Sequence, residues 1–171
     1  MSNEASEQRS IGRSMIIGMW VLALALAVLL VNRSLERSRN PNDAVVSSVD
    51  GGKRSISLQQ NRWGHYLVTG SINGSAIDFL VDTGASTVSI PADFAARIGL
   101  PKGDSIPIST ANGMGVAYRT RIDSLTIGDL EIRNATAHIN PGLSGEVLLG
   151  MSVLKHYELV QRGNQLIIRE P

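Results

Sequence analysis

Two patterns of hydrophobic and polar residues divide the chain. From Met15 to Val31 the residues are apolar and uncharged, whereas short apolar and polar stretches alternate after residue 52. As a helix, the apolar run spans roughly 26 Å, slightly less than the ~30 Å hydrocarbon core of a bilayer. Arg13 and Arg33 flank the run and can reach the headgroups. The pattern predicts an N-terminal tail over residues 1–14 and a transmembrane signal anchor over residues 15–31.

A cleaved signal peptide is the competing interpretation of this run. Its small residues Ala23, Ala25 and Ala27 lie inside the run, and the apolar sequence continues beyond them to Val31. A cleavage site is expected after the apolar region rather than within it. We therefore favour an anchor that stays attached.

The segment over residues 32–52 is polar, contains Asn40-Pro41-Asn42 and Gly51-Gly52, and shows no sustained periodicity. It is predicted to be a flexible linker. The folded domain is then expected over residues 53–171 and is mostly strand, with Asn73-Gly74 as a strong signal for a hairpin turn. The predicted strands cover residues 55–60, 64–72, 75–81, 106–110, 116–122, 124–127, 131–139, 147–149, 157–161 and 165–169.

Helices are few in the predicted domain. Residues 91–98 form one short helix, because Pro91 stands near its start and Gly99 follows its end, and residues 151–155 form a single helical turn. Many short strands with few helices are typical of a closed or partly closed β-barrel. The predicted fold class is therefore mostly β, with one or two short helices and one N-terminal transmembrane helix before the barrel.

Composition and charge narrow the classes of function. The formal net charge is +1, and Lys and Arg are scattered without a basic patch, so no nucleic-acid partner is expected. The absence of cysteine excludes disulfides, thiolate catalysis and cysteine metal sites. The three histidines lack the spacing of metal ligands, and no metal or cofactor is expected.

The candidate for chemistry is Asp82, which follows the apolar residues Phe79-Leu80-Val81. A buried strand that ends there delivers the carboxylate to a tight turn, in which Gly84 can adopt a positive φ and backbone N–H groups can point at the carboxylate. An Asp before Thr and Gly is also a common turn residue, so the surrounding pattern decides the interpretation. The loop that we expect around the carboxylate consists of Thr83, Gly84, Ala85 and Ser86.

The stretch from Phe79 to Thr87 (FLVDTGAST) resembles the active-site loop of retropepsin-like aspartic peptidases. Val147 to Leu154 (VLLGMSVL) resembles the second structural motif of that fold, here Leu148, Leu149 and Gly150. Residues 64–87 and the sequence TANG at Thr110 to Gly113 look like the membrane-anchored bacterial members in particular. The resemblance covers roughly residues 64–169 and implies the barrel of one acid-protease half.

The chain contains one Asp-Thr-Gly and no second one. Hydrolysis by this family's mechanism uses two carboxylates that share one proton, so the resemblance implies a homodimer in which Asp82 faces Asp82 of the partner subunit. Thr83 would then bond across the pair, and Gly84 would leave room for it. Because Ala85 lacks a hydroxyl that could stabilise an ionised carboxylate, we expect an activity optimum nearer mild acid than strong acid.

Two further segments gain roles through the resemblance. The implied flap, a hairpin that covers an extended peptide substrate, consists of Ala111, Asn112, Gly113, Met114 and Gly115. An ordinary Gly-rich turn is the alternative. Residues 165–168 form either a plain edge strand or a strand of a dimer sheet.

Together these features predict a membrane-anchored aspartic endopeptidase that acts on polypeptides. The alternatives are a catalytically inactive, membrane-tethered binding or scaffold module with an acid-protease fold, and a lipid- or small-ligand-binding barrel. An inactive relative would be expected to lose Asp82, Thr83 or Gly84, and all three are present.

The resemblance also implies a single-pass protein of the bacterial inner membrane with its catalytic domain in the periplasm. Charge counting does not fix the orientation, because similar numbers of arginines stand on the two sides of the span. These are Arg9 and Arg13 before it, and Arg33, Arg37 and Arg39 after it.

Overall fold

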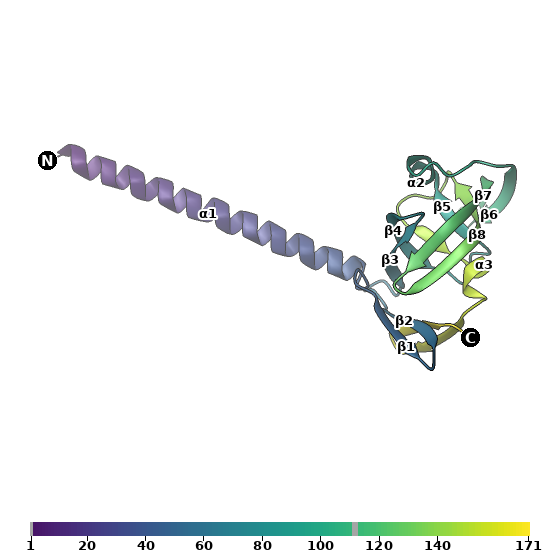
Figure 1. The fold of residues 1–171 in the computed structure, drawn as a ribbon. Coiled ribbons are helices and arrows are strands. Elements are labelled where there is room, and N and C mark those ends of the chain that lie inside the picture. The colour runs from purple at the N-terminus through teal and green to yellow at the C-terminus, as the bar shows by residue number, and fades with distance from the viewer. Residues whose placement is uncertain (1, 111–112) are drawn as a thin grey trace. The chain divides into compact units, whose positions relative to one another are not determined.

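The computed structural model describes the backbone of residues 2–110 and 113–171, and side chains from Met15 onward within those ranges. The chain divides into two compact units, Met1–Ser38 and Arg39–Pro171. The first unit is a single helix, α1 (Ser2–Arg39), whose last residue belongs to the second unit. The second unit holds all the described strands (Figure 1).

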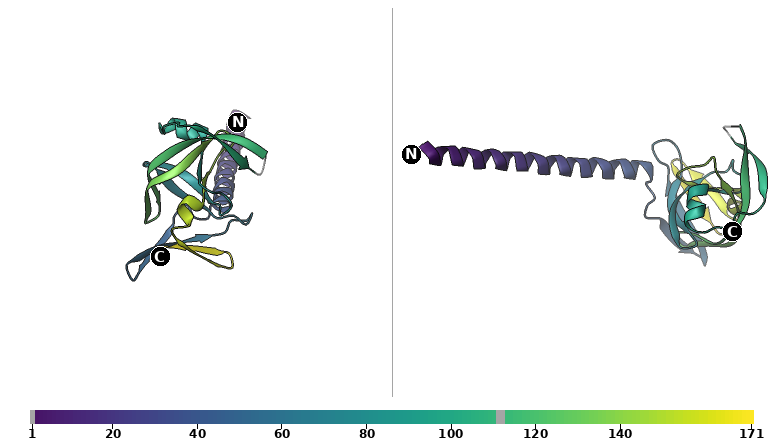
Figure 2. Two further views of the ribbon diagram at one scale, coloured as in Figure 1. Left: turned by 90° about the vertical axis from the view of Figure 1, so that its right-hand side faces the viewer. Right: turned by 90° about the horizontal axis from the view of Figure 1, so that it is seen from above.

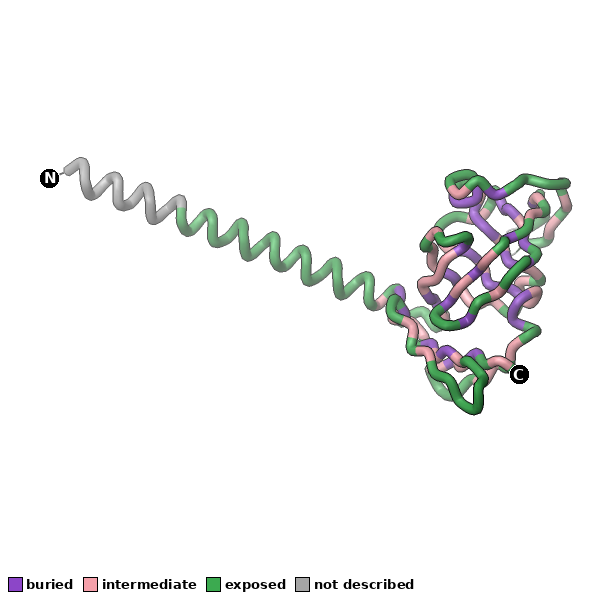
Figure 3. Tube along the Cα trace, viewed as in Figure 1, coloured by how far each residue is buried: buried purple, intermediate pink, exposed green. Residues whose placement is uncertain are grey.

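Helix α1 is long and apolar enough between Met15 and Arg39 to cross a membrane, although an N-terminal signal sequence would meet the same criterion. The described apolar side chains of this stretch are exposed, including Trp20 at 67% (Figure 3). A helix that is apolar on all sides is typical of a bilayer or a large protein core. The most apolar part of Met15–Arg39 is not buried against the described part of the chain.

The larger sheet is a closed barrel, as predicted. Its seven strands follow the order β3-β4-β9-β5-β8-β7-β6, and β3 also pairs with β7, so the first six strands form a ring (Figure 2). The strands are β3 (Leu67–Ile72), β4 (Ser75–Val81), β5 (Val88–Pro91), β6 (Ser105–Thr110), β7 (Gly113–Ile127), β8 (Leu130–Asn140) and β9 (Val147–Leu149).

Closure of the ring depends on a small residue in β3. A Cβ atom at Gly70 would lie 2.3 Å from the backbone oxygen of Thr126 in β7. Directly beside this contact, Ser71 pairs with Thr126 and their hydroxyls lie 2.6 Å apart. Glycine therefore permits the close approach of β3 to β7 that seals the barrel.

A second sheet has the order β1-β2-β11-β10. Its strands are β1 (Val46–Asp50), β2 (Lys53–Gln59), β10 (Glu158–Arg162) and β11 (Gln165–Arg169). The C-terminal strand β11 pairs with β2 on one side and with β10 on the other, so it is an interior strand and not the plain edge strand considered from the sequence. The edges of this sheet are β1 and β10.

The segment predicted to be a flexible linker, residues 32–52, has regular structure over most of its length. Helix α1 continues to Arg39, and strand β1 pairs in full register with β2. Between them, Asn40 and Asn42 are buried, at 8% and 3% exposure. The compact unit thus begins at Arg39 rather than at the expected residue 53.

Asn42 explains why local composition was misleading there. Its side-chain amide donates to the backbone oxygens of Gln59 (2.9 Å) and Leu67 (2.7 Å). Its side-chain oxygen accepts from the Gln59 N–H (2.6 Å). One polar side chain therefore joins the ends of β2 and β3, a long-range role that a polar local sequence does not reveal.

The remaining elements agree closely with the sequence. Asn73 and Gly74 form the β3–β4 turn with φ of 49° and 80°. Helix α2 (Ala92–Arg97) and helix α3 (Met151–Leu154) stand where short helices were expected. Two differences remain: the runs predicted over residues 116–122 and 124–127 are one strand, β7, and strand β5 was not predicted.

The core fills the barrel with aliphatic residues and two phenylalanines. Phe79 and Phe94 are the largest fully buried side chains. Ile56 and Leu58 point inward from β2 while their neighbours are less buried, as a period of two requires. The core cluster includes residues of both sheets, so the smaller sheet packs as part of the same unit.

We predict that Asn42→Ala destabilises the chain by about 2–4 kcal/mol, because it leaves three backbone groups of β2 and β3 without their partner. The measurement is urea unfolding of the full chain in detergent. The matched control is Asn164→Ala, which removes an exposed amide from the β10–β11 turn. Equal unfolding midpoints for the two variants would contradict the role given to Asn42.

Candidate active site

Asp82 stands directly after β4, at the point where that strand leaves the barrel wall. β4 runs parallel to β9, with Val81 opposite Leu149. The Asp82 N–H continues this ladder by donating to the Leu149 carbonyl at 3.1 Å. The backbone of Asp82 is therefore fixed by the strand that carries the second predicted motif.

The carboxylate of Asp82 is held by its own loop. Oδ1 accepts a hydrogen bond from the Gly84 N–H at 2.9 Å, and the Asp82 carbonyl accepts from the Ala85 N–H at 3.2 Å. Asp82 is half-buried, whereas Thr83 and Gly84 are exposed. Gly84 does not have the positive φ expected from the sequence, and it holds the carboxylate through its N–H alone. The loop thus orients one carboxylate beside exposed residues.

The second predicted motif lies against this loop. The N–H groups of Met151 and Ser152 donate to the carbonyls of Ala85 (2.8 Å) and Ser86 (2.9 Å). A Cβ at Gly150 would meet the Thr87 oxygen at 2.3 Å and the Ala85 oxygen at 2.7 Å. The structure therefore brings the two sequence motifs together, and the glycine is what lets the start of α3 touch the loop.

Two side chains that the sequence did not single out support the same loop. The hydroxyl of Ser152 accepts from the Val88 N–H at 3.2 Å and donates to the Thr136 carbonyl at 3.4 Å. His138 Nδ1 lies 3.0 Å from the Thr87 hydroxyl. Neither contact has a local sequence signal, because the partners are far apart along the chain.

His138 has an unusual environment for a histidine on a strand. Partial burial lowers the pKa of His138, and the nearby guanidinium of Arg119 lowers that pKa further. The two residues are cross-strand neighbours on β7 and β8. The neutral imidazole is therefore the favoured partner of the Thr87 hydroxyl.

The segment predicted as the flap is the β6–β7 hairpin. Its strands pair from Ser105 opposite Tyr118 to Thr110 opposite Gly113. Of the predicted flap residues, Gly113, Met114 and Gly115 lie at the start of β7, and Met114 is 77% exposed. Ala111 and Asn112 lie outside the described residues.

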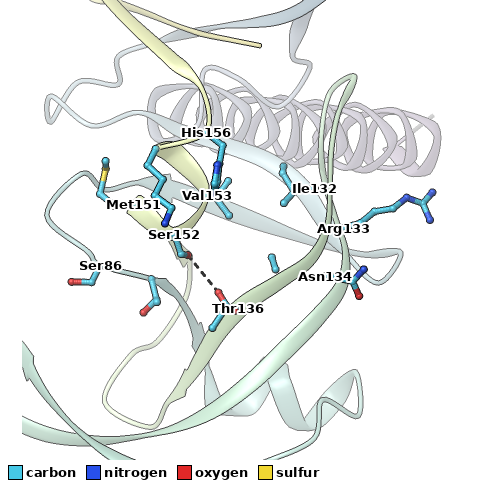
Figure 4. A pocket seen from close by; sticks show the side chains of 12 residues that line it. Ser86, Ile132, Arg133, Asn134, Thr136, Met151, Ser152, Val153 and His156 are labelled. Atoms are coloured by element: carbon cyan, nitrogen blue, oxygen red, sulfur yellow. Dashed lines mark hydrogen bonds between the residues drawn. The ribbon is translucent and has the colours of Figure 1, made fainter. Parts of the chain in front are cut away.

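A pocket of about 560 Å³ lies behind the loop, between α3 and β8 (Figure 4). Ser86 lines it from the loop, Ser152 from α3 and Thr136 from β8, and a hydrogen bond from Ser152 to Thr136 joins two of these lining residues. Asp82 is not among its lining residues. The pocket therefore belongs to the support of the loop rather than to the carboxylate.

Comparison with known proteins agrees with this geometry. The family model of the gag-polyprotein putative aspartyl protease matches residues 68–156, which is just over half of the chain and includes Asp82 and Gly150. The chain belongs to this family of retropepsin-like aspartic proteases.

A solved structure described as a retropepsin-like aspartic protease from Rickettsia conorii is similar to this chain, with 26% sequence identity and a TM-score of 0.57. The match covers 74% of this chain and 94% of that one. It confirms the predicted fold class.

Two curated relatives are uncharacterized proteins. One, encoded in the cobV 5′ region of a Sinorhizobium species, is 32% identical over 76% of this chain. The other, from Rickettsia prowazekii, is 31% identical over 66% of this chain. The chain matches 58% and 50% of the lengths of these relatives, so each of them is considerably longer than the matched region.

We predict that Gly150→Ala destabilises the fold by about 3 kcal/mol or more, because the new methyl group overlaps two loop carbonyls. Thermal unfolding of the full chain measures this. The matched control is Gly142→Ala, whose added Cβ would meet its nearest atom at 3.4 Å. If both variants unfolded at the wild-type temperature, the close contact between α3 and the loop would be refuted.

We also predict a pH dependence of stability that originates at His138. Because the pKa of His138 is lower in the folded chain than in the unfolded chain, the unfolded state binds more protons as the pH falls below about 6.5. Stability therefore decreases from neutral pH toward mild acid. In His138→Gln the unfolding temperature should fall less over this range than in the wild type.

The control for this pH experiment is His65→Gln, which replaces an exposed histidine. It should keep the wild-type pH dependence. If His138→Gln kept the wild-type dependence as well, the environment assigned to His138 would be wrong.

Proposed function

We propose that the chain is a membrane-anchored aspartic endopeptidase that works as a homodimer. The observation that carries this proposal is the placement of Asp82. Its backbone is bonded to β9, one carboxylate oxygen is held by the Gly84 N–H, and Thr83 and Gly84 beside it are exposed. The family of the chain supports an aspartic protease activity.

The proposed reaction uses Asp82 and Asp82 of the partner subunit. Two nearby carboxylates share one proton, because the like-charge repulsion between them disfavours the doubly ionised pair. The ionised carboxylate takes a proton from water while the water oxygen attacks the peptide carbonyl carbon, and the protonated carboxyl gives its proton to the carbonyl oxygen. The gem-diol then collapses. The carboxyl that took the proton from water gives it to the amide nitrogen, and the other carboxylate takes a proton from one gem-diol hydroxyl. The C–N bond breaks, the carbonyl forms again, and an acid and an amine are released.

Dimerisation supplies the second carboxylate, because the sequence has a single Asp-Thr-Gly. The exposed Thr83 and Gly84 leave the edge of the loop open to a second copy. Two copies anchored in one membrane have a higher effective concentration than two free copies. In the proposed enzyme, anchoring therefore favours the dimer that activity requires.

The proposed substrate is an extended polypeptide. The β6–β7 hairpin offers main-chain groups for pairing with an extended chain, as in other modes of β-strand recognition. Met114 and Val116 at the start of β7 are exposed apolar side chains and would contact apolar side chains of the peptide. We place the flap role on this hairpin.

The proposed location is a bacterial inner membrane with the barrel in the periplasm. The apolar part of α1 is long enough to cross the bilayer. The similar proteins from Rickettsia and Sinorhizobium are bacterial, which supports a bacterial setting.

We predict that Asp82→Asn abolishes peptide hydrolysis by the full chain in vesicles, because an amide cannot take a proton from water. The assay is cleavage of an unbiased peptide library between weak acid and neutral pH. The matched control is Asp123→Asn, which changes an exposed aspartate of β7 and should retain activity.

Co-expression of wild-type and Asp82→Asn chains in equal amounts tests the shared pair of carboxylates. Random pairing gives each wild-type chain an active partner about half of the time, so activity per wild-type chain should fall to about half. A value unchanged by the mutant would exclude a shared site. If the wild type is inert in detergent and in vesicles alike, the binding-module interpretation replaces catalysis.

A further inference from the structure

An exposed tryptophan stands in the turn between β2 and β3. Trp63 is 53% exposed, and the Arg62 guanidinium lies over its ring, 4.2 Å from the ring centre. The chain has two tryptophans, and the other, Trp20, is in the apolar part of α1. We call residues 60–65 the Trp63 loop.

The Trp63 loop has a defined backbone conformation, so the residue that carries the exposed ring has a fixed place. The Asn61 side-chain oxygen accepts from the N–H groups of Trp63 and His65, each at 3.0 Å. The Asn61 N–H donates to the His65 carbonyl at 2.8 Å, and the Gly64 N–H donates to the Asn61 carbonyl at 3.0 Å. Asn61 therefore organises the whole turn.

The same asparagine ties the Trp63 loop to the point where the chain leaves α1. The Asn61 amide donates to the Arg39 carbonyl at 3.0 Å. Arg39 also forms an ion pair with Glu146 of the barrel unit. Trp63 is thus only two residues from a side chain that is bonded to the last residue of the helix.

The length of α1 brings this point close to a membrane surface. Arg39 lies eight residues beyond the end of the apolar run at Val31, which is roughly 12 Å of helix. A headgroup layer extends about 5–8 Å beyond the hydrocarbon core on each side, and a tilted helix reduces the height of Arg39 further. The Trp63 loop is therefore bonded to the chain at a point that lies close to the headgroups.

The chemistry of the loop suits a lipid surface. Tryptophan is enriched at membrane interfaces, where its ring packs among acyl ends and its N–H stays near water. Arginines near the surface attract anionic headgroups by about 1 kcal/mol each. Arg62 belongs to the loop. The helix adds two arginines between the apolar run and Arg39, namely Arg33 and Arg37.

We propose that the Trp63 loop docks on the membrane surface, with the Trp63 ring among the headgroups and Arg62 beside their phosphates. The loop is then a second attachment of the barrel to the lipid, in addition to the helix. This inference rests on the membrane anchoring in the proposed function.

Single-tryptophan variants of the full chain in vesicles test the docking. Trp20→Phe leaves Trp63 as the only fluorophore, and Trp63→Phe leaves Trp20. The vesicles contain phosphatidylcholine and phosphatidylglycerol, and the quenchers are lipids brominated near the top of the acyl chain and iodide in the water. We expect brominated lipid to remove most of the Trp63 emission and iodide to remove little of it.

The matched control places the fluorophore elsewhere on the barrel unit. Met114 is exposed on β7, so Met114→Trp in a chain with Trp20→Phe and Trp63→Phe should be quenched by iodide and little by brominated lipid. Adding Arg62→Glu to Trp20→Phe should reduce lipid quenching of Trp63, more so as the phosphatidylglycerol content increases.

The outcomes separate this inference from the anchor itself. If Trp63 is quenched by iodide and not by lipid, the docking is refuted. If Trp63 is shielded from both quenchers, it is covered by protein, and the docking is refuted as well. If brominated lipid quenches Trp20 in either case, the membrane anchoring by α1 is still supported. If brominated lipid does not quench Trp20, the anchoring in the proposed function is refuted.

Discussion

The parallel pairing of β4 with β9 is the constraint on which the candidate active site depends. It brings two segments that are more than sixty residues apart into one ladder, and the ladder ends with the bond from Asp82 to the Leu149 carbonyl. Because β9 runs directly into Gly150 and α3, the same pairing presses the first turn of α3 onto the loop after Asp82. The carboxylate is therefore positioned by backbone geometry, and its side chain needs only the Gly84 N–H to be oriented.

Around this ladder, the loop is supported by groups that do not touch the carboxylate. Ser152 links α3 to β5 and β8, and His138 reaches Thr87 from β8. Ser152 is the acceptor for the Val88 N–H, and His138 holds the Thr87 hydroxyl, so both fix the chain where it leaves the loop. The precision of the site thus comes from three neighbouring elements, which is how a loop can hold a reacting group steadily.

The sequence predicts this arrangement where the signal is local. Three signals determine the conformation of adjacent residues, and the structure matches each of them. They are the apolar trio before Asp82, the Asn73-Gly74 turn, and the Pro and Gly around α2. Strand β1 and the buried Asn42 were missed, because a polar segment becomes ordered only when distant backbone groups at β2 and β3 need partners. The contact of His138 with Thr87 was missed for the same reason: it exists only after β8 and the loop are brought together.

The joint between helix and barrel has a consequence for the release of the domain. From Arg39 to Asn42 the chain is bonded to the barrel by side chains and backbone, and from Val46 it is part of a sheet. A protease binds its substrate as an extended strand, so it can cut here only after this segment has opened. Cleavage between Arg39 and Asn42 is therefore governed by the free energy of local unfolding, to which the hydrogen bonds of Asn40, Asn42 and Asn61 contribute.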